Sequence, residues 1–329
     1  MMQPVLGVAA PEEVGLSTVG LDRIDAFLRT KIEDRELAGA VTMVGRHGRV
    51  VRTSIVGVDN TKNGKPLTAD TIFRIFSMTK PITGLAMGIL LDRELWLPDD
   101  PISKHLPEFA DLTVFAGLDG RGAPILDAPV HPPTMRELAT HTAGFSYGQV
   151  ADSWVDGRYK KNRLLKSKSL TDFTRKLARI PLNYQPGTKW QYSVSMDVQG
   201  AIIERLTGQS LPDFLQQNIF GPLGMVDTAF FVPRAKLARR ASLYYTGGKH
   251  TLRRIGWNPL YRDSTKNPRL PQGGPACSRP SAITQSSASC FWMVVNSVAF
   301  ASSVRRHSHS SCPTRSRSSS SPRASPPVT

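Results

Sequence analysis

The sequence predicts an α/β protein in which antiparallel strands are accompanied by helices. Three observations lead to this prediction: an amphipathic helix followed by a hairpin near the N-terminus, an apolar helix after residue 80, and a middle section with short helical stretches. At 329 residues and 40% hydrophobic composition, the chain has enough apolar material for one large domain or two interleaved domains.

The first predicted helix begins near the N-terminus and leads into a hairpin. Ser17 is of the residue type that caps helices, and apolar residues then recur at helical spacing at Leu21, Ile24, Phe27, Leu28 and Ile32. Two runs rich in β-branched residues follow at 38–46 and 49–56, separated by His47-Gly48, whose glycine tolerates a positive φ. The sequence therefore predicts an amphipathic helix and two antiparallel strands.

The later predicted helices differ in how apolar they are. Residues 81–91 are apolar on every face, which predicts a helix enclosed by protein on all sides. The section 92–182 is rich in Pro, Gly and polar residues and is interpreted as a helical and loop-rich subdomain. Its short helical stretches are 134–139 and 170–179. A further helix over 195–206 has one apolar face and ends before Gly208.

The net charge of +16 is concentrated towards the end of the chain. No Asp or Glu follows Asp263, whereas eight Lys and Arg residues do. A basic balance favours binding to phosphate backbones, but half of the net charge lies in this tail, so the body is only moderately basic. All three cysteines, Cys277, Cys290 and Cys312, also lie there, and their spacing matches neither a zinc site nor a disulfide framework.

Targeting and cofactor signals point to a protein of the cytoplasm without a prosthetic group. The first residues contain neither a basic segment nor an apolar run of signal-peptide length, which predicts a cytoplasmic location. The longest apolar run, 82–91, is roughly half of what a bilayer crossing requires. There is no glycine-rich phosphate loop, His-Glu-x-x-His motif or usable cysteine cluster in the sequence, so we expect no cofactor and no metal.

The tetrad Ser77-Met78-Thr79-Lys80 carries the first sign of chemistry. A serine hydroxyl needs a neighbouring base, and this spacing places an amine one helical turn from the serine. Although such a tetrad arises about once per chain by chance, Ser77 also opens the apolar helix, whose first backbone N–H groups suit a developing oxyanion. These features make Ser77 the candidate nucleophile, with Lys80 beside it.

Four segments around this tetrad carry a family resemblance. They are residues 73–91, 134–145, 186–193 and 221–225. In this order they resemble the serine β-lactamase-like hydrolases, especially the class C β-lactamases and the family VIII carboxylesterases. The resemblance covers residues 10–275 and implies the β-lactamase/penicillin-binding-protein-like fold: an antiparallel sheet flanked by helices, a mostly helical subdomain, and an active site between them. It also implies that Tyr192 faces Ser77 and Lys80 as their proton partner.

Other positions refine what the resemblance implies. Val194 stands where many family members carry an asparagine that binds the amide side chain of the substrate, and valine cannot make that hydrogen bond. This departure favours small esters over β-lactams. His141 lies in a short sequence motif that is structural in the family, and it has no partner histidine at metal-ligand spacing. We therefore expect no catalytic role for it. The other candidate tyrosines are expected to be packing residues: Tyr147, Tyr184, Tyr244 and Tyr245.

The resemblance ends at Pro275. Residues 276–329 form a low-complexity Ser/Arg/Pro tail, which we expect to be disordered. One hypothesis is a frameshift, because the codons for 283–285 and 292–296, read in a shifted frame, permit short amino-acid sequences that resemble those of the family. The alternative is a genuine Arg/Ser tail that binds RNA or an acidic partner. The sequence carries no recognisable third family motif after Pro275. We therefore expect a fold incomplete at its C-terminal end and a rate reduced by about 10²–10³.

The predicted function is a serine hydrolase, a carboxylesterase that acts on small esters through a Ser77 acyl-enzyme. The alternatives are a β-lactamase or penicillin-binding-like protein, an inactive pseudoenzyme, and a basic-tailed nucleic-acid binder. The expected partner is a small-molecule ester or β-lactam-like substrate, with no nucleic acid and no membrane. The oligomeric state does not follow from the sequence.

Overall fold

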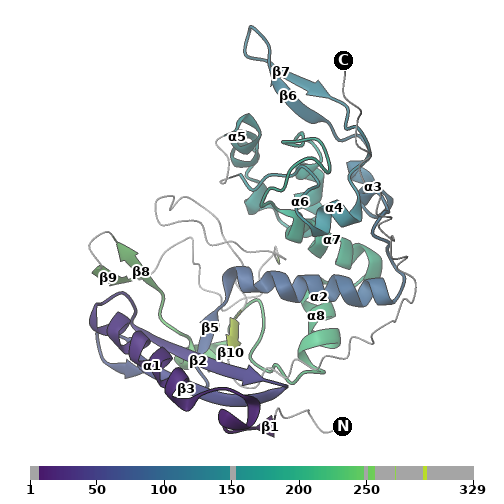
Figure 1. The fold of residues 1–329 in the computed structure, drawn as a ribbon. Coiled ribbons are helices and arrows are strands. Elements are labelled where there is room, and N and C mark those ends of the chain that lie inside the picture. Colours follow the sequence, from purple (N-terminus) through teal and green to yellow (C-terminus); the bar gives the residue numbers. More distant parts are fainter. Residues whose placement is uncertain (1–6, 149–152, 248–250, 256–270, 272–291, 295–329) are drawn as a thin grey trace, which may run out of the picture.

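The computed structural model describes residues 7–148, 153–247, 251–255, 271 and 292–294, and it has an α/β architecture. The N-terminal sheet with α1 lies on one side of α2, and α3 to α7 gather on the other (Figure 1). The α-helices are α1 (Thr18–Glu33), α2 (Thr79–Asp92), α3 (Ile102–His105), α4 (Met135–Ala139), α5 (Trp154–Lys161), α6 (Leu170–Leu177), α7 (Ser195–Thr207) and α8 (Leu211–Leu215). The strands are β1 (Gly7–Val8), β2 (Gly39–Arg46), β3 (Arg49–Asn60), β4 (Lys65–Pro66), β5 (Ile72–Arg74), β6 (Val114–Leu118), β7 (Pro124–Asp127), β8 (Tyr244–Gly247), β9 (Thr251–Arg254) and β10 (Trp292–Val294).

The N-terminal sheet has the strand order β1-β3-β2, with β4 paired to β3. β2 and β4 are antiparallel to β3, whereas the two residues of β1 pair with it in parallel. The turn between β2 and β3 is formed by His47 and Gly48, whose φ values are 53° and 71°. Two successive left-handed residues match the twist of the flanking strands, and the predicted hairpin is confirmed.

α1 packs on β2 and β3. It begins as predicted, because the side chain of Ser17 accepts a hydrogen bond from the backbone N–H of Gly20. The predicted apolar face is only partly covered: Leu21 is its one buried residue, and Phe27 is 60% exposed. Ion pairs supplement this contact, since Arg52 on β3 lies 2.6 Å from a carboxylate oxygen of Asp22 and 2.6 Å from one of Asp25.

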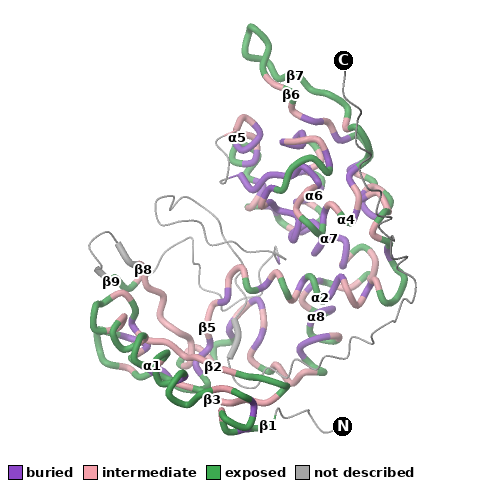
Figure 2. The backbone as a smooth tube through the Cα atoms, in the orientation of Figure 1, coloured by how far each residue is buried: buried purple, intermediate pink, exposed green. Residues whose placement is uncertain are grey.

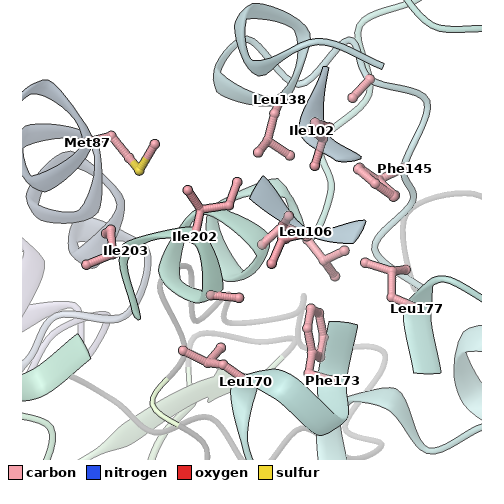
Figure 3. Close-up of a cluster of buried hydrophobic side chains, with 14 of the residues drawn as sticks. Met87, Ile102, Leu106, Leu138, Phe145, Leu170, Phe173, Leu177, Ile202 and Ile203 are labelled. Atoms are coloured by element: carbon pink, nitrogen blue, oxygen red, sulfur yellow. The ribbon is translucent and has the colours of Figure 1, made fainter. Parts of the chain in front are cut away.

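The main hydrophobic core lies in the helical part, around α7. This helix packs against α2, α4, α6 and α8. In Figure 3, Ile202 of α7 lies between Met87 of α2 and Phe173 of α6. The predicted helices of this region are confirmed, and α4 begins with a capping box in which Thr134 and Glu137 each bind the other's backbone N–H.

The prediction that α2 is enclosed on all sides is wrong. Its buried residues are Thr79, Thr83, Ala86, Met87 and Leu90, while Leu85 is 37% exposed. α7 is the helix surrounded by protein, because residues 195–203 are all buried. Its polar groups tolerate burial through hydrogen bonds: Gln199 Nε2 donates to the carbonyl oxygen of Leu138 at 3.4 Å, and Ser195 Oγ bonds Ser193 Oγ at 2.7 Å.

The helical subdomain contains a hairpin that the sequence did not predict. β6 and β7 pair antiparallel and project from the helices (Figure 1), and all four residues of β7 are exposed (Figure 2). At its base, the backbone N–H of Phe115 donates to the carbonyl oxygen of Leu182 at 2.9 Å. The Phe115 ring also stacks on Trp154 of α5, with centroids 5.1 Å apart. Contacts with distant residues therefore hold this exposed hairpin.

Most of the predicted tail, 276–329, lies outside the described residues. Within it, the structure describes β10, in which Met293 pairs with Phe73 of β5 in an antiparallel register. The three cysteines, Cys277, Cys290 and Cys312, also lie outside the described residues. The tail boundary at residue 275, its disorder and its origin stay predictions.

Candidate active site

Ser77 lies in a 3-10 turn, Phe76–Met78, immediately before α2. Phe76 has a φ of 45°, an uncommon conformation for a residue other than glycine. Two hydrogen bonds hold this turn: Thr79 Oγ1 donates to the carbonyl oxygen of Phe76 at 2.6 Å, and the Met78 N–H donates to that of Ile75 at 2.9 Å. Strained backbone of this kind is found at functional sites, and this turn positions Ser77 at the start of α2.

The structure brings the three predicted site residues together. Ser77 Oγ lies 3.3 Å from the Tyr192 hydroxyl oxygen, and Lys80 Nζ lies 3.3 Å from Ser77 Oγ. Lys80 Nζ also lies 4.7 Å from the centroid of the Tyr192 ring. Lys80 comes from the first turn of α2 and Tyr192 from the segment before α7, so the packing of α2 against α7 sets this geometry.

Two more rings pack against Tyr192. His141 stacks on it with centroids 5.4 Å apart and an interplanar angle of 17°, and Tyr147 meets it at 5.4 Å and 51°. Trp190, which is 63% exposed, meets His141 edge-on at 6.3 Å. The sequence and the family resemblance predict a structural role for His141 and a packing role for Tyr147. Tyr147 is buried as expected, but the ring it packs against is that of Tyr192.

The imidazole of His141 also makes a hydrogen bond to a serine that follows Tyr192. Its Nδ1 lies 2.9 Å from Ser193 Oγ, and Ser193 Oγ lies 2.7 Å from Ser195 Oγ. Burial lowers the pKa of His141, and the positive charge of Lys80 lowers it further. The imidazole is therefore neutral at neutral pH.

A buried carboxylate, which the sequence analysis did not single out, supports the same region. Asp156 of α5 is 1% exposed and accepts hydrogen bonds from Ser146 Oγ and, at 3.0 Å, from the backbone N–H of Gly148. Gln191 Nε2 donates to Ser146 Oγ at 3.0 Å, and the Val194 N–H donates to the Ser146 carbonyl oxygen at 3.1 Å. Asp156 thus connects α5 to the segments on both sides of Tyr192.

Among the residues that the structure describes, no three His, Cys, Asp or Glu side chains gather as a metal site. None of the helices in the described ranges has both the length and the apolar composition to cross a membrane.

The family model described as Beta-lactamase matches residues 24–291. The chain belongs to the Beta-lactamase family. All four segments that carried the sequence resemblance lie within the matched residues, so the resemblance and the predicted fold are confirmed.

Relatives of this Beta-lactamase family member include esterases. Esterase EstB of Burkholderia gladioli is 35% identical over 260 residues, which are 78% of this chain and 61% of EstB. Lovastatin esterase of Penicillium rubens is 31% identical over 228 residues, which are 66% of this chain and 55% of the relative. The solved structure of EstCE1, "a hydrolase with promiscuous acyltransferase activity", matches with a TM-score of 0.63 and 25% identity over 78% of this chain and 68% of EstCE1. The chain thus spans less than two thirds of the length of these curated relatives.

Val194 occupies the position at which the resemblance places an asparagine in many Beta-lactamase family members. Its side chain is fully buried and belongs to the helical core, and its backbone leads directly into α7. The side chain therefore faces the interior and offers no polar group to a substrate.

Proposed function

We propose that this chain is a serine hydrolase that acts on small carboxylic esters through an acyl-enzyme on Ser77. The observation that carries the proposal is the placement of Ser77 Oγ 3.3 Å from both Lys80 Nζ and the Tyr192 hydroxyl. A nucleophilic serine requires a base within hydrogen-bond reach, and apo structures often show such bonds slightly long. The esterase names of two relatives support the same reaction class.

In the proposed reaction, Ser77 Oγ forms a bond to the ester carbonyl carbon while its proton passes to the Lys80 and Tyr192 pair. The tetrahedral intermediate then collapses, the bond to the alkoxide breaks, and the same pair returns the proton to the leaving alcohol. Water next attacks the acyl-enzyme, releasing the acid and regenerating Ser77.

Simple esters are the proposed substrates rather than β-lactams. The buried, apolar Val194 supports this choice, because it offers no amide to hydrogen-bond the side chain of a β-lactam. A comparison of p-nitrophenyl acetate with the cephalosporin nitrocefin tests it, and we expect a much higher kcat/KM for the ester. Comparable values for the two substrates would contradict the ester preference.

Acyl transfer to an alcohol is the second candidate function. It is favoured by the EstCE1 title, which names promiscuous acyltransferase activity, and by relatives named as methylbutanoyltransferases. The same Ser77 acyl-enzyme serves both reactions, and the acceptor, water or alcohol, decides the product. Ester products formed in the presence of added alcohols would favour this second function.

The central test removes the nucleophile. In Ser77→Ala we expect no hydrolysis of p-nitrophenyl butyrate above background and no adduct with a fluorophosphonate, whereas the parent chain carries one adduct on the peptide that contains Ser77. Because turnover is expected to be slow without a recognisable third motif, mass spectrometry of the adduct is the primary measurement. Undiminished labelling of Ser77→Ala would remove Ser77 from the mechanism.

A pair of tyrosine variants tests the proton partner. Tyr192→Phe is expected to lower kcat about 10²–10⁴-fold, the range for loss of a general acid–base group. Tyr184→Phe is the matched control, because the hydroxyl of Tyr184 bonds Lys189 Nζ at 3.1 Å rather than Ser77. Equal activity of the two variants would exclude Tyr192 as the proton partner.

A further inference from the structure

His141 contacts three consecutive residues of the segment that carries Tyr192. Its backbone carbonyl oxygen accepts from the N–H of Gln191 at 2.9 Å, its ring stacks on Tyr192 at 5.4 Å, and its Nδ1 lies 2.9 Å from Ser193 Oγ. One histidine therefore holds the residues before and after Tyr192 and supports the face of the Tyr192 ring.

Rigid elements hold both ends of this arrangement. His141 follows α4 in the left-handed conformation, with φ 60°, which histidine adopts more readily than most residues other than glycine. Ser193 is buried and bonds Ser195 Oγ at 2.7 Å, at the start of the buried helix α7. The ring of His141 is consequently oriented from α4 on one side and from α7 on the other.

The Tyr192 hydroxyl lies at the limit of hydrogen-bond reach from Ser77 Oγ. Its distance of 3.3 Å from Ser77 Oγ is already at the long end of a hydrogen bond. A displacement of about 1 Å at a reacting group lowers a rate about 10²-fold. A modest shift of the Tyr192 ring would therefore break the contact with Ser77.

We propose that His141 is a positioning residue that acts through Tyr192, keeping its hydroxyl in contact with Ser77. The proposal rests on the proposed hydrolase function of Ser77 and Tyr192. It gives His141 no contact with the substrate and no proton to transfer.

A kinetic double-mutant cycle tests whether His141 acts through Tyr192. His141→Asn removes the ring but keeps a hydrogen-bonding side chain that tolerates the left-handed backbone. With p-nitrophenyl acetate we expect His141→Asn to lower kcat about 10–100-fold with KM changed less than about threefold. In a Tyr192→Phe background the same substitution should lower kcat less than about threefold, because residues that act as one unit are not additive. Equal effects of His141→Asn in the two backgrounds would overturn the proposal.

Two controls separate positioning from folding. His47→Asn is the matched control, since His47 also has a left-handed backbone, φ 53°, but lies in the turn between β2 and β3. We expect it to leave kcat unchanged. His141→Ala loses both the ring and the hydrogen bond, and its kcat should be lower than that of His141→Asn even when the two variants have similar thermal midpoints. If kcat falls only in proportion to the thermal midpoint across His47→Asn, His141→Asn and His141→Ala, the positioning proposal is overturned.

A spectroscopic measurement tests the contact without catalysis. In histidine-labelled full-length chain, the ring resonance that disappears in His141→Asn identifies His141. Tyr192→Leu should move that resonance by loss of the aromatic ring current, and Tyr184→Leu should not. An unmoved His141 resonance in Tyr192→Leu would overturn the positioning proposal, whatever the activity. If the resonance does shift but Ser77→Ala still hydrolyses esters, the proposed function is overturned while the contact between His141 and Tyr192 is established.

Discussion

Replacing Gly144 with alanine is expected to destabilise the protein more than the same change at Gly208. Both glycines have left-handed backbone, with φ of 85° and 68°, so alanine is strained at each by about 1–2 kcal/mol. At Gly144 an added Cβ would collide with the carbonyl oxygen of Tyr184, whereas at Gly208 nothing lies within 4 Å of it. The two variants therefore share the backbone strain and differ in the collision.

The collision at Gly144 involves backbone atoms, so no rotation of a side chain relieves it. The backbone N–H of Asn183 donates to the Gly144 carbonyl oxygen at 2.7 Å and holds the two segments together. Forcing such segments apart adds about 1–3 kcal/mol. We expect Gly144→Ala to lower the free energy of unfolding by about 2–5 kcal/mol and Gly208→Ala by about 1–2 kcal/mol.

Urea unfolding followed by tryptophan fluorescence and circular dichroism measures this difference, provided that the m-values agree. Gly144 lies in the segment between His141 and Tyr147, both of which contact the Tyr192 ring. Ester hydrolysis should therefore also fall in Gly144→Ala but not in Gly208→Ala. Unfolding free energies of the two variants within about 0.5 kcal/mol of each other would refute the reasoning.

Three further outcomes are expected. Asp156→Ala should lower the unfolding free energy by about 3 kcal/mol, because it leaves buried donors unsatisfied. Asp172→Ala removes a half-exposed pair with Lys176 and an exposed hydrogen bond from the Lys168 N–H, and should lower it by about 1 kcal/mol; similar urea midpoints for the two variants would contradict this. Folding lowers the pKa of His141, so its contribution to the free energy of unfolding is complete above about pH 6.5 and is lost as the pH falls below that value. Between pH 7 and 5, the unfolding free energy measured with urea should therefore fall more steeply in the parent chain than in His141→Asn. The frameshift hypothesis predicts that a chain with the shifted reading frame after residue 275 hydrolyses esters about 10²–10³-fold faster than the 329-residue chain. Equal rates would contradict this prediction.

Local features of this protein could be predicted from the sequence because neighbouring residues alone determine them. Ser17 caps α1, the turn at His47 and Gly48 joins β2 to β3, and Thr134 begins α4. The spacing of Ser77 and Lys80 similarly places an amine near a hydroxyl through a single turn of backbone. In each case the interacting groups are at most a few positions apart, so the chain itself brings them together.

The identity of Tyr192 as the third site residue came from family resemblance, since no local pattern singles out one tyrosine before a helix. The residues that contact the Tyr192 segment could be identified only from the tertiary structure. His141 and Ser193 are 52 positions apart, and Gln191 and Ser146 are 45 apart. Only the packing of α4, α5 and α7 brings these groups within hydrogen-bond distance.

The burial of α2 and α7 shows the same limit. The sequence determined that both segments are helices, because apolar periodicity and the glycine at the end of α7 act locally. Which helix is enclosed was decided by tertiary packing. The first nine residues of α7 are buried, and Gln199 among them donates a hydrogen bond to the carbonyl oxygen of Leu138 on α4. This hydrogen bond between residues 61 positions apart offsets part of the desolvation of Gln199. The apolar periodicity of α7 does not reveal such a partner, because the partner lies on another helix.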